Sequence, residues 1–377
     1  TYGMKAPQHF GRWAAHFTGT QYAFPDQKIE LVVDFYLDGV TRSLVHGSKW
    51  DPGTLDRAIS RNSEQLEDTR PGLLSPDIPR NLMAATSYRQ DELGESLRLR
   101  NGEKEPEYGH SHFFWRSEYY SHQRPHYFAS VRMFSSRSYN MDRPYNSEGL
   151  KNHHLGDGAN FISRTGKEYK DIYPVYDWQK IPGTTVVQKP SLPPPDEITH
   201  AGQTDFVGGV TDGIHGAAAF DFISPHDPLA ARKAWFFFDE EFVSLGAGIN
   251  SGVEHPVATT LNQCFLLGDV AVSTKDGWLN VPQDDHELES VTWIHHDDMA
   301  YVFPDPQNVR LSNNTSSGTW RSINRQQWAT DEEINEDVFK LWIDHGYNPV
   351  KGKYAFIVVP GIKAEQVERY RKDTQCH

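Results

Sequence analysis

The hydrophobic and polar positions of the first hundred residues follow a helical pattern. Residues 29–37 (IELVVDFYL) form one apolar run, and residues 58–68 and 81–99 are rich in Leu, Arg, Glu and Gln, which favour helices. Five prolines between residues 25 and 79 separate these segments, as expected of residues in loops or in the first turn of a helix. The pattern therefore predicts a helical region at the start of the chain.

After residue 108 the pattern changes to short apolar runs separated by turn residues, which is typical of antiparallel strands. Residues 296–298 and 239–241 each separate two apolar runs and predict tight hairpins. Residues 339–343 alternate with a period of two, which favours a strand, although Thr330 and Glu333 also fit a helix capping box. The clearest predicted strands are residues 127–134, 235–238, 257–272, 291–295, 299–303 and 354–359.

A charged segment separates the two patterns. Residues 101–108 (NGEKEPEY) contain Gly and Pro among acidic and basic side chains, and we place a domain boundary there. A chain of 377 residues is long enough to bury two moderate cores. We therefore expect an α+β multidomain protein, with a helical domain over residues 1–104 and a large antiparallel β domain over residues 105–377. Residues 190–195 are expected to form an extended surface connection.

Charge and composition narrow the function classes. The formal net charge of −14 argues against nucleic acid as a partner, because phosphate binding needs a surplus of Lys and Arg. No segment approaches the ~18 consecutive apolar residues of a membrane span, and no signal peptide is visible. Aromatic residues make up 12 % of the chain, which suits either sugar binding or a large aromatic core. Cys264 and Cys376 lie far apart and predict no disulfide framework.

The richest candidate for chemistry is a polar, glycine-rich stretch over residues 146–185, which lies between predicted strands. It contains Glu148, the pair His153 and His154, and the triplet at residues 156–158 (GDG). Loops held by a rigid scaffold are common places for binding and catalytic residues. The glycines also fit a simple reading in which they serve turns and Glu148 is solvated.

The order of short motifs along the chain resembles polysaccharide lyase family 8, the hyaluronate, chondroitin and xanthan lyases. One match is N-x-E-x-L-K at residues 146–151, followed by GDG, DW and PGTT. Another is residues 56–61 (DRAISR), which are similar to the family motif G-R-x-I-S-R. The chain departs from the family pattern at Asp56, where Gly is usual, and at Gly149, where Asn is usual. Further matches occur at residues 36–39, 208–209, 231–239, 259–263 and 344–346.

This resemblance implies a fold and a setting. Family members resemble a helical (α/α) toroid followed by a multi-layered antiparallel β-sandwich and a smaller β domain. The chain is accordingly expected to hold the C-terminal part of the toroid and the sandwich. The missing N-terminal helical segment would come from the same protein or from a companion chain. The resemblance also implies a secreted or periplasmic enzyme that acts on an acidic polysaccharide.

The implied reaction is β-elimination at a uronic acid, which needs a base, a group that neutralises the carboxylate and an acid for the leaving oxygen. Matched residue by residue, Tyr2 takes the position of the family's catalytic Tyr, and Arg57 and Glu148 take those of the supporting Arg and Glu. A guanidinium near the phenol would make it a more effective base. The implied substrate-binding residues are Arg61, Lys151, Asn152 and Trp178.

Several points stay open in the sequence. The family's catalytic His precedes the Tyr, where this chain has only Thr1. His153, His154 and Asp157 also permit a metal interpretation, although no metal site is assigned and no cofactor is required. A divalent cation as an accessory remains an alternative. So do a non-catalytic carbohydrate-binding module and a glycoside hydrolase, which would need two carboxylates flanking the bond.

Overall fold

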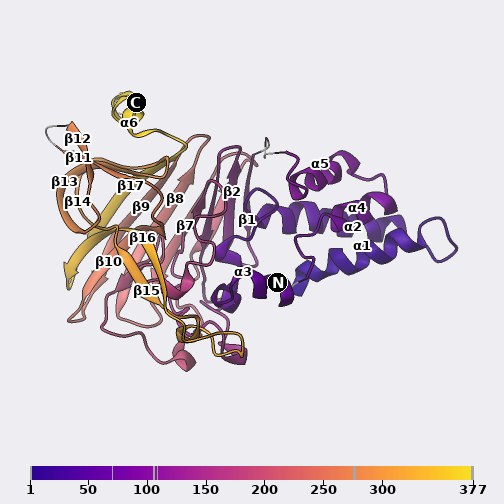
Figure 1. The fold of residues 1–377 in the computed structure, drawn as a ribbon, viewed down its shortest axis with the longest axis horizontal. Helices are drawn as coiled ribbons and strands as arrows, with labels where there is room; N and C mark the ends of the chain where they lie inside the picture. Colours follow the sequence, from indigo (N-terminus) through magenta and orange to yellow (C-terminus); the bar gives the residue numbers. More distant parts are fainter. Residues whose placement is uncertain (1, 70, 105–106, 108, 275–276, 375–377) are drawn as a thin grey trace.

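The computed structural model describes the chain except residues 1, 70, 105–106, 108, 275–276 and 375–377. Its first hundred residues are helical, as predicted, and Figure 1 shows most of these helices gathered at one side of the molecule. The α-helices are α1 Lys5–Phe17, α2 Asp26–Asp34, α3 Ser63–Thr69, α4 Asp77–Ala85 and α5 Gln90–Arg100. The 3-10 turn η1 Tyr2–Met4 precedes α1, and four short 3-10 or π elements lie between α2 and α3: η2 Phe35–Val40, η3 Thr41–Ser43, η4 Pro52–Thr54 and η5 Asp56–Ser60.

Two predicted helices are broken. The predicted helix over residues 58–68 is divided into η5 and α3, with Arg61 in an extended conformation between them. The predicted helix over residues 81–99 is divided into α4 and α5 at residues 86–89. Arg89 there has a left-handed φ of 49° and binds Asp38 with two guanidinium nitrogens. The breaks fall at Asn62 and at Thr86, Ser87 and Tyr88, which are weaker helix formers than the Leu-, Arg- and Glu-rich residues around them.

The β region begins at His110 and contains seventeen strands among the described residues. Four of them form a sheet in the order β1-β2-β3-β4: His110–Phe114, Tyr119–Arg124, Tyr127–Arg132 and Ile162–Ser163. A second sheet of thirteen strands has the path β12-β11-β13-β14-β17-β9-β8-β7-β6. The strands β5, β10, β15 and β16 branch from β14 through β16, and neighbouring strands run antiparallel.

The bounds of the second sheet agree with most of the predicted strands. They are β5 Thr185–Val187, β6 Val207–Thr211, β7 Gly216–Ile223, β8 Leu229–Phe237, β9 Phe242–Ser251, β10 Pro256–Phe265, β11 Val270–Thr274, β12 Gly277–Val281, β13 Asp285–His296, β14 Met299–Ser312, β15 Thr315–Gly318, β16 Ile334–Tyr347 and β17 Gly352–Pro360. The predicted strand over residues 257–272 is two strands, β10 and β11. Residues 339–343 are strand, not helix, and the last helix, α6, spans Ala364–Thr374.

Both predicted hairpins are confirmed. β8 and β9 pair through Phe237 and Phe242, on either side of residues 238–241. β13 and β14 pair at His296 and Met299, which leaves Asp297 and Asp298 as a two-residue turn. Their φ values of 48° and 53° are the left-handed values that a tight antiparallel hairpin requires. The turn residues 190–195 connect β5 to η8 Pro195–Glu197 without a strand.

The buried apolar side chains form separate cores. The helices α1, α2, α4 and α5 enclose a core that includes Ile29, Val33, Leu82 and Leu93. The much larger β core also takes in residues from η4–α3: Leu55, Ala58, Ile59 and Leu66. Trp50 packs against both cores. Figure 1 accordingly shows α3 beside the strands, apart from α5 and α4.

No described helix is both long enough and apolar enough to cross a membrane. Cys264 is buried in the β core, and Cys376 lies outside the described residues. Helix α5 ends at Arg100 and the first strand, β1, begins at His110.

Candidate active site

Arg57, Arg61 and Glu148 meet where the η5–α3 segment lies against the β region. Arg61 binds Glu148 in a bidentate manner, with Nε donating to Oε1 at 2.9 Å and Nη2 donating to Oε2 at 2.7 Å. The Nε of Arg57 lies 3.7 Å from Oε2 of the same carboxylate. The side chain of Glu148 is only 4 % exposed. One buried carboxylate therefore lies between two guanidinium groups, whose mutual repulsion it offsets.

The spacing of the two arginines in the sequence does not explain why they converge on Glu148. Although they are four residues apart, they do not lie on one face of an α-helix, because Arg57 lies in the 3-10 turn η5 and Arg61 follows it with φ −103° and ψ 143°. The chain changes direction at Ser60, whose Oγ accepts a hydrogen bond from the backbone N–H of Gly149 at 2.9 Å. This contact draws the two segments together.

The loop that carries Glu148 has an unusual backbone. Asn146, Ser147 and Gly149 have φ values of 58°, 57° and 69°, all left-handed. The two non-glycine residues store strain and persist in this conformation because surrounding contacts hold them, whereas Gly149 adopts it at no steric cost. Glu148 forms a β-bridge with Asn324, whose side chain donates to the carbonyl of Ser60 at 3.2 Å. The strained loop is thus fixed from both sides.

Gly149 allows this loop to approach Arg57. A Cβ at this position would lie 2.8 Å from both the Cα and the Cβ of Arg57, closer than real side chains come. Its left-handed φ also disfavours most other residues. The Gly at a position where the family usually has Asn keeps the same preference for a left-handed backbone.

Asp56 is the other departure from the family pattern, and the structure gives it a role. Its φ of 53° is left-handed, the conformation for which Gly is the usual residue. The carboxylate pairs with Nη2 of Arg132 on β3 at 2.6 Å. The side-chain amide of Asn152 donates to the Asp56 carbonyl at 3.0 Å. An ion pair to the β region therefore accompanies the turn that precedes Arg57.

The carboxyl group of Asp51, directly before η4, is buried against the β region. Asp51 is fully buried and accepts hydrogen bonds from Tyr119 on β2 at 2.8 Å and from Ser130 on β3 at 3.0 Å. Burial raises the pKa of Asp51 to about 7, although these hydrogen bonds and Arg132 oppose the shift. Asp51 thus ties the start of the η4–α3 segment to two strands.

Two neighbours of Arg57 were not predicted. Asp142 accepts a short hydrogen bond from Nη1 of Arg57 and forms an ion pair with it. The ring of Tyr145 lies under the same guanidinium, 5.6 Å from its carbon, as a cation–π contact. Both precede the matched motif by a few residues, and neither has a spacing or composition signal that would single it out.

The predicted substrate-binding residues are divided between the site and the core. Lys151 is half-buried, its ammonium lies 3.4 Å from Ser322, and burial lowers its pKa. Asn152 is 1 % exposed and packs beneath the turn at Asp56. Trp178 is 3 % exposed and belongs to the β core, with its ring 5.6 Å from Tyr176. The structure therefore does not bring Trp178 to the cluster around Glu148.

The histidine pair is buried beside this loop. Nδ1 of His154 lies 2.9 Å from Oδ2 of Asp157, and both side chains have almost no exposed surface. His153 packs against His226, with their ring centroids 5.3 Å apart, and burial lowers the pKa of each to about 4. Across the described ranges, no three His, Cys, Asp or Glu side chains are arranged to hold a metal ion together.

The side chain of Tyr2 lies outside what the structure describes, and only its backbone is placed, at the start of η1. The next two residues, Gly3 and Met4, line a cavity of about 330 Å³ that Asp56 and Arg132 also line. The two residues that follow Tyr2 therefore line a cavity together with Asp56, which precedes Arg57.

Comparisons with known proteins match this chain to one family. Residues 109–371 match the model of the super-sandwich domain of polysaccharide lyase family 8. The chain is 34 % identical over 366 residues to a chondroitinase-AC from Pedobacter heparinus, covering 95 % of this chain and 50 % of that protein. It is 29 % identical over 267 residues to a hyaluronate lyase from Thermasporomyces composti, covering 67 % of this chain and 33 % of that protein.

A solved structure agrees. A chondroitinase AC lyase studied in complexes with oligosaccharides superposes with a TM-score of 0.87 at 33 % identity, covering 98 % of this chain and 54 % of that one. The chain thus spans about half the length of these two chondroitinase relatives. It belongs to polysaccharide lyase family 8, whose super-sandwich domain it carries in residues 109–371.

Proposed function

We propose that the protein containing this chain cleaves a uronic-acid-containing glycosaminoglycan, either chondroitin or dermatan sulfate or hyaluronan, by β-elimination. The observation that carries the proposal is the convergence of Arg57 and Arg61 on the buried Glu148. This convergence lies in a chain that is similar over 95 % of its length to a chondroitinase-AC. The products would be unsaturated oligosaccharides.

The two arginines are suited to different tasks. Arg61 uses Nε, Nη1 and Nη2 in hydrogen bonds to Glu148 and Thr69, so its guanidinium is fixed. Among the described residues, Arg57 donates a side-chain hydrogen bond only to Asp142. It keeps donors for a substrate carboxylate or for a phenolate. We assign Arg57 to the reacting end of the cluster and Arg61 to holding Glu148 and the sugar beside it.

Proton transfer is assigned to Tyr2. As base, the phenolate would take the proton at C5; as acid, the phenol would return a proton to the oxygen that leaves C4, so the residue ends in its starting state. The positive charge of Arg57 favours the phenolate and offsets the charge that develops on the substrate carboxylate. Lys151 adds a further positive charge at the Glu148 loop. In this proposal a His and an Asn come from a helical segment that precedes the chain or from a companion chain.

The domain division is also part of the proposal. Residues 1–104 would form the end of an α-helical toroid, and residues 105–377 the antiparallel β-sandwich. The separate helical core around Ile29 and Leu82 supports this division for α1, α2, α4 and α5, whereas the η4–α3 segment packs against the β core. Because such polymers lie outside cells, we infer that the protein acts as a secreted or periplasmic enzyme.

The test is to incubate the whole protein with chondroitin sulfates, dermatan sulfate and hyaluronan, and to follow the ultraviolet absorbance of the unsaturated uronate. Elimination gives that absorbance together with new reducing ends. New reducing ends without it would point to a glycoside hydrolase and overturn the proposal. Binding of the polymer without new reducing ends and without the absorbance would point to a carbohydrate-binding module.

The assignment of Tyr2 has its own test. Tyr2→Phe removes the titrating hydroxyl but keeps the ring, so it should abolish elimination while oligosaccharide binding stays within about twofold. Retained turnover in this variant would remove Tyr2 from the mechanism.

A further inference from the structure

A second cavity is lined by Arg61, by residues of α3 and by a turn of the β region. It has a volume of about 530 Å³, within the range of small-molecule pockets. Residues 49–74 form one wall and residues 163–173 the other. We call it the lysine pocket, because its lining includes Lys49, Lys167 and Lys170.

The charges of the lysine pocket are unusual for this protein. Among the described residues, no carboxylate lies within 4 Å of the ammonium groups of Lys49, Lys167 or Lys170. The two acids in the lining are engaged by backbone groups: Glu67 accepts from the N–H of Gly72 at 3.0 Å, and Asp171 from the N–H of Ser63 at 2.7 Å. A chain of net charge −14 thus holds a local surplus of cations here.

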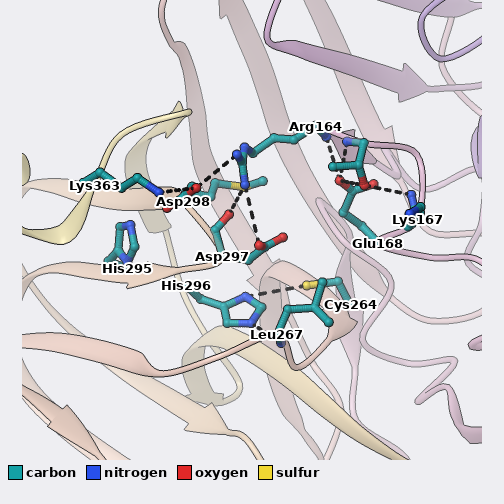
Figure 2. Close-up of polar contacts among 12 residues, drawn as sticks. Arg164, Lys167, Glu168, Cys264, Leu267, His295, His296, Asp297, Asp298 and Lys363 are labelled. Atoms are coloured by element: carbon teal, nitrogen blue, oxygen red, sulfur yellow. Dashed lines mark hydrogen bonds and ion pairs between the residues drawn. The ribbon is translucent and has the colours of Figure 1, made fainter.

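The wall that carries Lys167 and Lys170 is a fixed turn. The buried carboxylate of Glu168 accepts from the N–H groups of Arg164 and Thr165 at 2.9 and 2.6 Å and from the Thr165 hydroxyl at 2.9 Å. Figure 2 shows Arg164 reaching from this turn to Asp297 and Asp298 at the β13–β14 hairpin. The lysines therefore project from a preformed surface, which lowers the entropic cost of binding.

The helical side is joined to the same turn. The ammonium of Lys49 donates to the carbonyl of Thr165, and a ring nitrogen of His46 lies 2.7 Å from the carbonyl of Arg164. Gly166 has a φ of 78°, and a Cβ there would lie 2.6 Å from Cδ of Lys49. The two walls of the lysine pocket are thus held at a set distance.

Arg61 connects the lysine pocket to the candidate active site. It lines the pocket, and the same guanidinium holds Glu148. The remaining lining includes the half-buried aromatic residue Trp50 and the aliphatic residues Pro52 and Leu74, with the buried rings of Tyr169 and Tyr173 beneath them. Cations beside aromatic and aliphatic surface form the combination that an anionic sugar needs, since it presents a charged group and an apolar ring face.

We propose that the lysine pocket binds a sulfate- or carboxylate-bearing sugar unit of the polysaccharide, away from the bond that is cleaved. The nature of this ligand rests on the proposed function. Lys167, Lys170 and Lys49 contact its anionic group, and the pocket holds a remote part of the polymer while another part reacts near Arg57. It is a binding site and takes no part in proton transfer.

The test compares Lys167→Ala/Lys170→Ala with Lys28→Ala/Lys372→Ala, which removes two exposed lysines elsewhere. Titration calorimetry of the whole protein with a chondroitin 4-sulfate hexasaccharide should show binding about fivefold weaker in the first variant, with a smaller salt dependence. The control variant should bind as the wild type does. In the elimination assay, KM for the polymer should rise about fivefold with kcat unchanged.

The outcomes separate this site from the proposed reaction. Unchanged binding and unchanged KM in the first variant, with elimination proceeding, would overturn the lysine pocket and leave the reaction standing. Binding that depends on Lys167 and Lys170 in a protein that makes no unsaturated product would support the pocket and overturn the reaction. Displacement of the hexasaccharide by inorganic sulfate at equal ionic strength and equal concentration would overturn the assignment to a sugar.

Discussion

Two neighbouring parts of the N-terminal region are held by different cores. The helices α1, α2, α4 and α5 bury their apolar side chains against one another, including Ile29 and Leu82. The segment from η4 to α3 instead buries Ile59 and Leu66 among the side chains of the β region. This segment carries both arginines of the candidate active site. The geometry of the arginines therefore depends on the β region, although they lie between helices in the sequence.

This difference in packing explains how Arg57, Arg61 and Glu148 are held together where the helical and β regions meet. Helices packed only against helices could shift relative to the sheet and carry the arginines away from Glu148. A segment that shares the β core moves with Glu148 and keeps the bidentate contact. Substitutions at Glu148, Ile59, Gly149 and Asp56 test whether the η4–α3 segment belongs with the β region.

The largest effect is expected for Glu148→Ala. The variant leaves two partly buried guanidinium groups without their shared carboxylate, so the free energy of unfolding should fall by about 3–5 kcal/mol. Elimination should fall by about a thousandfold, because Arg57 loses its position. Urea unfolding and the product absorbance measure the two effects. Glu287→Ala, which removes a 76 % exposed partner of Arg310, should change stability by less than about 1 kcal/mol. A Glu148 variant as stable as this control would contradict the role of the cluster.

Ile59→Ala and Leu82→Ala test the comparison directly, because both side chains are fully buried but lie in different cores. Each should lower the free energy of unfolding by about 3 kcal/mol. Hydrogen exchange should show lost protection in β3 and η5 for Ile59→Ala, and in α1 and α4 for Leu82→Ala. Elimination should fall more in the first variant. Equal loss of protection in the helices for both variants would show that the segment belongs to the helical region.

Gly149→Ala tests the close approach between the Glu148 loop and Arg57. Gly248→Ala is the matched control, because Gly248 has a similar φ of 62° but nothing within 4 Å of an added Cβ. Both carry the cost of a left-handed Ala, about 1–2 kcal/mol. Gly149→Ala should lose about 2 kcal/mol more because of the overlap with Arg57, and elimination should fall at least tenfold. Equal stabilities would show that the loop relaxes away from Arg57 without loss.

The sequence predicts the parts of this structure that depend on neighbouring residues. The β13–β14 hairpin follows from Asp297 and Asp298 between two apolar runs. The break before Arg61 was not predicted, because it depends on Ser60 and Gly149, which are 89 residues apart. The family resemblance assigned Arg61 and Glu148 to one site, and their bidentate contact is seen only in the structure. Asp142 and the lysine pocket were missed, since their residues are brought together by the fold and share no motif.

Lys233 on β8 is buried in the β region. Among the described residues, its ammonium donates hydrogen bonds to backbone carbonyls and to no carboxylate. Its ammonium donates to the carbonyls of Asp157, at 3.0 Å, and Gly183, and burial lowers its pKa to about 7. In the unfolded chain the pKa of Lys is about 10.4. Between about pH 7 and 10 the unfolded chain therefore binds more protons at this residue than the folded chain does, and the free energy of unfolding rises with pH.

The free energy of unfolding is expected to rise by at most about 1.4 kcal/mol per pH unit. Below pH 7 this dependence disappears, because Lys233 is protonated in both the folded and the unfolded chain. Lys233→Met should remove it, whereas Lys353→Met, an exposed control on β17, should keep it. Urea unfolding at pH 7.5 and pH 9 measures the difference. A pH dependence that survives in Lys233→Met would assign it to other groups.

The smallest effect is expected at Asp56, where the strain of the turn and its ion pair to the β region oppose each other. Asp56→Gly relieves the left-handed φ of 53° but loses the contact with Arg132, so stability should stay within about 1 kcal/mol of the wild type. Asp56→Ala loses the contact and keeps the strain, so it should be about 1 kcal/mol less stable than Asp56→Gly. Arg132→Met removes the ion pair and leaves Asp56 in the turn, but it also removes the hydrogen bond from Arg132 to the carbonyl of Gly53. If Arg132→Met lowers elimination while Asp56→Gly does not, Arg132 acts through another partner, such as the carbonyl of Gly53 at 3.1 Å. If both lower it by a similar factor, the ion pair from β3 positions Arg57, and the η4–α3 segment is tied to the β region by charge as well as by its buried side chains.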